Sequence, residues 1–206
     1  PIMPMLYPVS ACAPNAASIV QPEETGFTFT YYMPDGMTVV PDASSISVSG
    51  TYYVAKTNDA TGCMSELAPI SVTINERPVL PAIPAVAECA PNTASILQTA
   101  EGGYIFAYYM SDGTSILSNP DAISKSATYY VAKINDATGC MSEKMPVSVT
   151  INPRPQIPPL DPIEECYPNT ADIEQSAEAG YSFIYYDQDA STILSNVSNI
   201  SVSGVY

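Results

Sequence analysis

The chain has 206 residues and a formal net charge of −15, with 21 acidic residues, 6 basic residues and no histidine. Nucleic acid and anionic membranes would repel so acidic a surface, so the composition argues against both as partners. No apolar run approaches the roughly 18 residues that a membrane-spanning helix needs. Twenty prolines and ten glycines interrupt the sequence too often for long helices, which favours an all-β protein.

One 16-residue stretch organises the rest of the sequence. Residues 51–66 (TYYVAKTNDATGCMSE) return at 128–143 with 15 of 16 positions identical, so the period is 77 (128 − 51). A fixed period marks a tandem array of one folding unit. We therefore predict repeats at residues 1–77 and 78–154 and a third, C-terminally incomplete repeat at 155–206. Both ends fall out of register with the repeats, so we expect a segment of a longer protein.

Each repeat is predicted to begin with a proline-rich extended segment that leads into an edge strand, such as residues 76–88. A Cys-x-Pro-Asn turn and a short strand follow. The next strand, FTFTYY in the first repeat, alternates two sets of side chains, and a period of two places one set on a buried face. The predicted core aromatics are Phe27, Phe29, Tyr31, Tyr104, Phe106, Tyr108, Tyr181, Phe183 and Tyr185.

The second half of each repeat is predicted to add further short strands. An Asp-Gly turn at 35–36 precedes a short strand, and residues 51–56 form a strand dense in Tyr and Val. An Asn-Asp-Ala-Thr-Gly loop leads to the last strand, at 69–75. About seven short strands in under 80 residues predict a two-sheet antiparallel sandwich.

The five cysteines follow the same period. Cys12 and Cys63 lie 51 residues apart, as do Cys89 and Cys140, and Cys166 would pair about eleven positions beyond the C-terminus. A metal site is disfavoured because the cysteines are not clustered and there is no histidine. We therefore predict one disulfide within each repeat, joining loop regions at a domain end. Because disulfides persist outside the reducing cytosol, the protein is expected to be secreted.

The sequence predicts no enzyme and no cofactor, because without histidine a Ser-His or Cys-His nucleophile cannot be assembled. Lys56 lies near Asn58 in the sequence, as in lysine–asparagine crosslinks, but the pattern lacks a catalytic acid. One tyrosine of each Tyr-Tyr doublet points outward and either packs on the sheet or stacks on a sugar. Weak calcium candidates, none in a dense alternating-acid loop, are Asp35, Asp112, Asp187 and Asp189.

The motifs C-x-P-N, TYYVAK-x-ND-x-TGC and a closing ISVTIN or VSVTIN together resemble the immunoglobulin-like repeats of large secreted proteins of Bacteroidota. Those proteins are surface adhesins, including gliding-type ones, exported by the type IX secretion system. The resemblance covers essentially the whole chain. It implies an all-β fold of tandem immunoglobulin-like antiparallel β-sandwich domains in an elongated array, outside the cell and attached to it. It carries over no catalytic residues.

We therefore expect a non-enzymatic structural or adhesive protein, a disulfide-stabilised rod, stalk or filament on a bacterial cell surface. Its expected partners are neighbouring repeats, identical chains in a filament, or a surface glycan or protein. Two alternatives stay open. An accessory glycan-binding module of a secreted enzyme would present exposed aromatics in a flat patch. A pilus-type subunit would have its incomplete repeat filled by a strand from another chain.

Overall fold

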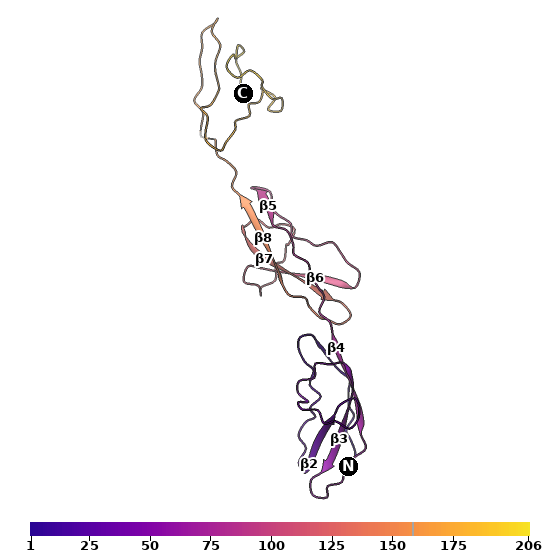
Figure 1. The fold of residues 1–206 in the computed structure, drawn as a ribbon. Helices are drawn as coiled ribbons and strands as arrows, with labels where there is room; N and C mark the ends of the chain where they lie inside the picture. Colours follow the sequence, from indigo (N-terminus) through magenta and orange to yellow (C-terminus); the bar gives the residue numbers. More distant parts are fainter. Residues whose placement is uncertain (158) are drawn as a thin grey trace. The chain divides into compact units, whose positions relative to one another are not determined.

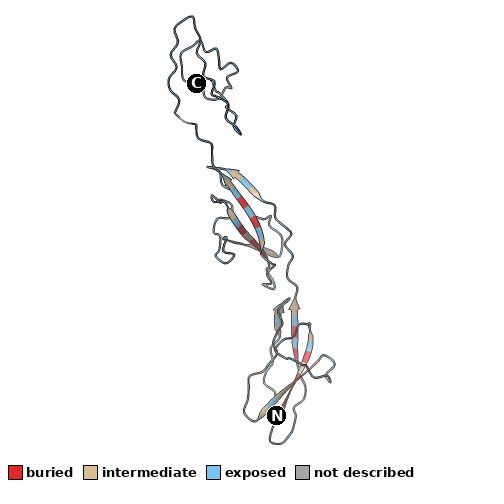
Figure 2. Cartoon of the chain, turned by 60° about the vertical axis from the view of Figure 1, so that its left-hand side comes forward, coloured by how far each residue is buried: buried red, intermediate tan, exposed pale blue. Residues whose placement is uncertain are grey.

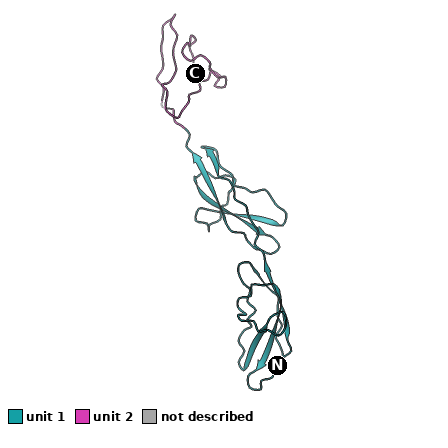
Figure 3. Ribbon diagram, viewed as in Figure 1, with its two compact units in different colours: residues 1–154 teal, residues 155–206 magenta. Residues whose placement is uncertain are grey.

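The computed structural model describes residues 1–157 and 159–206, which divide into two compact units, 1–154 and 155–206 (Figure 3). Every regular element within those residues is a β-strand, so the all-β prediction is confirmed. The described part of the chain accordingly holds no helix that is long and apolar enough to cross a bilayer. The first unit contains two four-stranded sheets (Figure 1).

The two sheets share one strand order, β1-β4-β3-β2 in the first and β5-β8-β7-β6 in the second. The first sheet comprises β1 (Val9–Cys12), β2 (Phe27–Tyr32), β3 (Gly50–Asn58) and β4 (Ala68–Asn75). The second comprises β5 (Val86–Cys89), β6 (Tyr104–Tyr109), β7 (Ala127–Asn135) and β8 (Met145–Asn152). Each strand begins and ends one sequence period after its counterpart, so the sequence repeat and the structural repeat coincide.

One strand pairing differs from the antiparallel arrangement that we predicted. β2, β3 and β4 pair antiparallel, but β1 runs parallel to β4, with Val9 opposite Val72 and Cys12 opposite Asn75. Parallel neighbours need a long connection between them, and here residues 13–67 supply it. Cys12 therefore lies where β4 ends and the chain leaves the repeat.

The layer that faces each sheet is held by single bridges between short segments. In the first repeat, Ala17 and Ile46 exchange two backbone hydrogen bonds of 2.8 Å, and Ile19 donates to the Ala43 carbonyl at 2.9 Å. Turns interrupt these segments every few residues and prevent longer pairing. The predicted seven strands therefore appear as four regular strands and a set of bridged segments.

The core of each of the first two repeats lies between the sheet and this bridged layer. Val54 and Ile19 are at most 1% exposed, and buried positions alternate with exposed ones along the strands (Figure 2). Phe29 and Tyr31 are half-buried and pack against this cluster. The Tyr31 hydroxyl also accepts a hydrogen bond from the Gln21 N–H at 2.7 Å. Phe29 and Tyr31 thus line the core, whose centre is filled by aliphatic side chains, whereas Phe27 is half-buried and is not among the residues packed against it.

The second repeat follows the same plan, but the third departs from it. Phe106 and Tyr108 pack against the second core. Tyr181 is 54% exposed, so the prediction of a buried ring is wrong there. Its counterpart Tyr104 is covered by the Lys133 ammonium, 4.0 Å from the ring centroid. Phe183 and Tyr185 are half-buried.

A buried tyrosine fixes the corner where the chain enters β3. The Tyr52 hydroxyl, on a residue that is 3% exposed, donates to the Val48 carbonyl at 3.0 Å. Tyr129 and Tyr206 make the same contact with the carbonyl four residues upstream. This is the tyrosine corner of immunoglobulin-like sandwiches. Together with the β2–β3–β4 sheet order, it makes the fold immunoglobulin-like.

An aspartate closes the turn after β2 and recurs with the period. Asp112 Oδ1 accepts the N–H groups of Thr114 at 2.7 Å and Ser115 at 2.8 Å, and its Oδ2 accepts the Ser115 hydroxyl. These bonds stabilise the carboxylate, the Ser115 hydroxyl most strongly, and they lower the pKa of Asp112 to about 2. Asp35 and Asp189 make the equivalent bonds, which lower the pKa of both carboxyl groups.

The tyrosine corner predicts a stability effect for Tyr52→Phe. The substitution keeps the ring but removes one hydrogen bond, so it should lower the free energy of unfolding by about 1 kcal/mol. Urea denaturation followed by circular dichroism measures this, with Tyr7→Phe as the control because Tyr7 is 70% exposed. Equal midpoints for the two variants would contradict a structural role for the corner.

The turn aspartate predicts a pH dependence. A carboxyl group whose pKa is lower in the folded state stabilises the fold above its unfolded pKa, and this contribution is lost as the pH falls through the folded value. For Asp112 the loss falls between the ordinary value of 3.8 and about 2. Asp112→Asn replaces the carboxylate with an amide, which still has an acceptor oxygen for the two backbone N–H groups but does not titrate. Its urea midpoint should therefore decline less than that of the wild type over this range, and identical declines would refute the assignment.

Candidate functional site at the junction between the first two repeats

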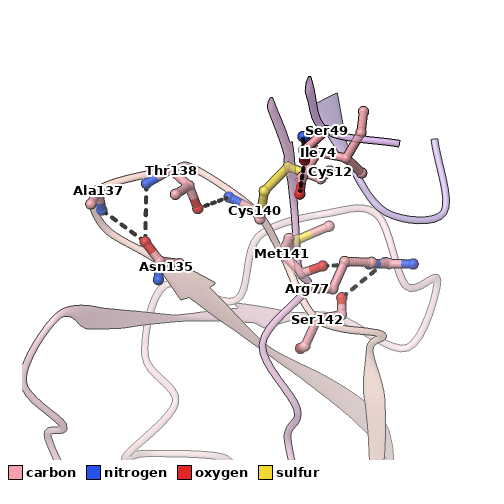
Figure 4. The surroundings of a disulfide bond; sticks show 10 residues. All are labelled: Cys12, Ser49, Ile74, Arg77, Asn135, Ala137, Thr138, Cys140, Met141 and Ser142. Carbon is pink, nitrogen blue, oxygen red and sulfur yellow. Dashed lines mark hydrogen bonds between the residues drawn. A yellow bond between two sulfur atoms is a disulfide. The ribbon is translucent and has the colours of Figure 1, made fainter. Parts of the chain in front are cut away.

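A disulfide joins the two sheets of the first unit. Cys12, at the end of β1, is bonded to Cys140 in the loop after β7, with 5.5 Å between the Cα atoms (Figure 4). The separation of 128 residues is one period more than 51 (51 + 77), so the bond runs from one repeat to the next. Cys63, Cys89 and Cys166 are exposed free thiols. The predicted pairs Cys12–Cys63 and Cys89–Cys140 are therefore wrong.

The parallel pairing of β1 explains why the bond leaves the repeat. Cys12 lies beside Asn75 at the end of β4, whereas Cys63 is in the loop before β4 begins. The eight residues of β4 place these two ends roughly 25 Å apart at about 3.3 Å per residue. A disulfide needs Cα atoms within about 7 Å, so the two cysteines of one repeat cannot meet.

The loop that carries Cys140 is held in shape by its own hydrogen bonds. Asn135 Oδ1 accepts the N–H groups of Ala137 and Thr138, each at 3.0 Å. The Asn135 N–H donates to the Cys140 carbonyl at 2.9 Å. Gly139 has a φ of +69°, a conformation that residues with a side chain rarely adopt. The loop therefore presents its cysteine in a defined position.

Arg77 makes a second contact across the same junction. Its Nε donates to the Met141 carbonyl at 2.7 Å and its Nη2 to the Ser142 carbonyl at 3.3 Å (Figure 4). Because these residues directly follow Cys140, the disulfide and the guanidinium hold adjacent parts of one loop. Our sequence analysis missed this residue. A signal was present, since the chain's two arginines, Arg77 and Arg154, each precede a proline and are one period apart.

Comparing the Cys63 loop with the Cys140 loop shows how the junction changes the exposure of the cysteine. Cys140 is 0% exposed, whereas Cys63 occupies the same position in the same loop sequence and is exposed. On the opposing face, Cys12 is half-buried and its counterpart Cys89 is exposed. Since the local sequences and hydrogen bonds match, the neighbouring repeat accounts for the difference in burial.

The buried Lys56 forms an ion pair and lies over an aromatic ring. Its Nζ is 2.6 Å from Glu24 Oε2 and 4.0 Å from the centroid of the Phe27 ring, which compensates the buried ammonium. Asn58 Oδ1 instead accepts backbone N–H groups of its own loop. The structure therefore does not engage Lys56 with Asn58 as a crosslink would require. The second repeat has the same arrangement in Lys133, Glu101 and Tyr104.

The calcium candidates do not form a cluster. Asp35, Asp112 and Asp189 use their carboxylate oxygens to hold the turns described above, and Asp187 Oδ1 accepts the Gln188 N–H at 2.7 Å. In residues 1–157 and 159–206, no group of three or more Cys, Asp or Glu side chains could hold a metal ion. Calcium binding stays a prediction.

The outward tyrosines of the first two repeats pack against their own repeat. Tyr109 donates its hydroxyl to Met141 Sδ at 3.6 Å, and the Lys144 ammonium lies 3.9 Å from its ring centroid. Tyr32 makes the equivalent sulfur contact with Met64 at 3.8 Å. The ring face of Tyr109 is therefore covered, which disfavours it as an open platform for a sugar.

The arginine contact predicts how readily the junction opens. Arg77→Ala removes hydrogen bonds from a charged donor, each worth about 1.5–3 kcal/mol, so the Cys12–Cys140 bond should be reduced at least about tenfold faster by dithiothreitol. Alkylation of released thiols followed by mass spectrometry measures the rate. Arg154→Ala is the control, because that residue occupies the equivalent place one repeat later and lies outside this junction. Equal rates for both variants would show that Arg77 does not hold the junction.

Residues 78–153 match the family model described as "Ig-like domain CHU_C associated". The matched range contains all four strands of the second sheet, whose order and register the first sheet shares. No curated protein matches the chain. Among solved structures, "Sidekick-1 immunoglobulin domains 1-5" matches at 10% identity with a TM-score of 0.28, and we draw no argument from a score this low. The match covers 73% of this chain and 37% of that one.

Proposed function

We propose that this is a non-enzymatic extracellular structural protein of a bacterial cell surface, in which a disulfide ties the first repeat to the second. The observation that carries the proposal is the Cys12–Cys140 bond across the junction. The immunoglobulin-like match of residues 78–153 supports a structural module, and the disulfide supports an oxidising location. Export by the type IX system and an adhesive role belong to the same proposal and rest on the sequence resemblance.

The position of the disulfide determines how the protein carries tension. A bond within each repeat would leave the proline-rich link around residues 78–85 as the only covalent connection between two repeats. The Cys12–Cys140 bond spans this link, so tension passes through the sulfur atoms while residues 13–139 stay unloaded. We infer a spacer that resists extension, such as a stalk or filament.

The contacts disfavour one of the two alternative functions. The covered ring of Tyr109 disfavours a glycan-binding site at that position, whereas Tyr186 in the third repeat is 41% exposed. A donor strand from another chain would have to complete the third repeat. Tyr181, which is 54% exposed, is a residue that such a strand would have to cover.

Single-molecule force extension tests the proposal on the 206-residue protein. With the disulfide intact, the segment between Cys12 and Cys140, a sequence separation of 128, cannot extend. Adding a reductant should therefore release roughly 430 Å of additional contour length at about 3.4 Å per residue. Cys12→Ser should show this length without reductant, and Cys63→Ser should behave like the wild type. Release in steps of roughly 170 Å, the length of about 51 residues, would instead indicate bonds within each repeat and overturn the proposal.

A further inference from the structure

We propose that Cys89 takes part in a second disulfide-linked junction between repeats. Its partner there is the cysteine in the Thr-Gly-Cys-Met-Ser loop of another repeat of this kind. The inference rests on the proposed function and extends it to residues that are free thiols in this structure. Its basis is the filled junction itself, in which the equivalent Cys12 holds Cys140 from such a loop.

The backbone around Cys89, at the end of β5, already has the geometry of the bonded Cys12 side. β5 pairs with β8 in the register of the first repeat, which places Cys89 opposite Asn152. Ala90 donates its N–H to the Asn152 carbonyl at 2.9 Å, and Ala13 donates to the Asn75 carbonyl at the same distance beside the bonded cysteine. The bonded and unbonded faces thus share one backbone geometry.

The exposed loop that carries Cys63 also has the conformation of the bonded Cys140 loop. In the first repeat, the Asn58 N–H donates to the Cys63 carbonyl at 2.9 Å, and Asn58 Oδ1 accepts the N–H of Thr61 at 3.0 Å. Gly62 has a φ of +70°, against +69° for Gly139 in the bonded loop. Neither the Cys63 loop nor the end of β5 that carries Cys89 needs to reorganise its backbone, which lowers the free-energy cost of joining them.

The free thiols Cys63 and Cys89 lie at opposite ends of the unit formed by the first two repeats. The filled junction brings the β4 end of the first sheet against the Cys140 loop of the second repeat. Cys63 lies at the other end of the first sheet, and Cys89 at the other end of the second. Within this chain they can therefore meet only between two copies, joined head to tail.

Bond formation needs an oxidant, for which a low-molecular-weight disulfide such as oxidised glutathione suffices. The Cys89 thiolate attacks this disulfide, forms a mixed disulfide and releases one glutathione thiol. The Cys63 thiolate then attacks the Cys89 sulfur and releases the second glutathione. Two cysteine thiols are oxidised and one glutathione disulfide is reduced to two thiols.

Cys166 provides a matched control within the chain. It lies in the same Cys-x-Pro-Asn motif and is also exposed. However, the described residues of the second unit form no regular strand, so no strand end presents this thiol as β5 presents Cys89. If thiol reactivity alone decided the outcome, Cys63 would form disulfides with Cys89 and Cys166 equally. If the Cys63 loop docks as proposed, it should form them with Cys89.

The test incubates the 206-residue protein in a glutathione redox buffer and maps intermolecular disulfides by mass spectrometry after proteolysis. Cys63–Cys89 links should exceed Cys63–Cys166 links and all three symmetric links by at least about tenfold, because only this pair combines the two preformed sides of a junction. Cys89→Ser should abolish chain joining, and Cys166→Ser should leave it unchanged.

Two outcomes overturn the inference: links distributed among the three thiols without preference, and monomers capped by glutathione. The same digest reports the Cys12–Cys140 peptide. If that link is present while Cys63–Cys89 is absent, this inference fails and the proposed function stands. If the Cys12–Cys140 link is itself absent, the proposed function fails.

Discussion

The parallel pairing of β1 with β4 is the constraint on which the rest of the structure depends. It places the first cysteine of each repeat where β4 ends, while the second cysteine lies in the loop before β4 begins. Each of the first two repeats therefore carries one sulfur at each end of its sheet. A sulfur at an end can bond only to a neighbouring unit, so the direction of a four-residue strand decides what the disulfide connects.

Placing the sulfur atoms at the ends leaves the core of each repeat to apolar side chains. In antibody domains the residue two positions after the corner tyrosine is a core cysteine, but here it is Val54, which is fully buried beside Ile19. In the chain-entropy model, closing 128 residues stabilises the fold by only about 1 kcal/mol more than closing 51. The advantage of the longer bridge is therefore the connection between repeats.

The sequence predicted the period, the all-β class and the aromatic strand well, because each depends on local patterns that recur. It could not decide the disulfide pairing. Separations of 51 and 128 residues differ by one whole period and are therefore equivalent in a tandem array, and the four residues VSAC of β1 carry no signal of strand direction. The exposure of Tyr181 could not be predicted from its own strand either, because its counterpart Tyr104 is covered by Lys133, a residue far along the chain.

The enclosed segment has a consequence for proteolysis. A protease that cuts a single peptide bond between residues 13 and 139 produces two fragments that remain attached through Cys12 and Cys140. A surface protein held by this bond keeps what it carries after a nick anywhere in the enclosed segment, because the sulfur atoms still connect the two fragments.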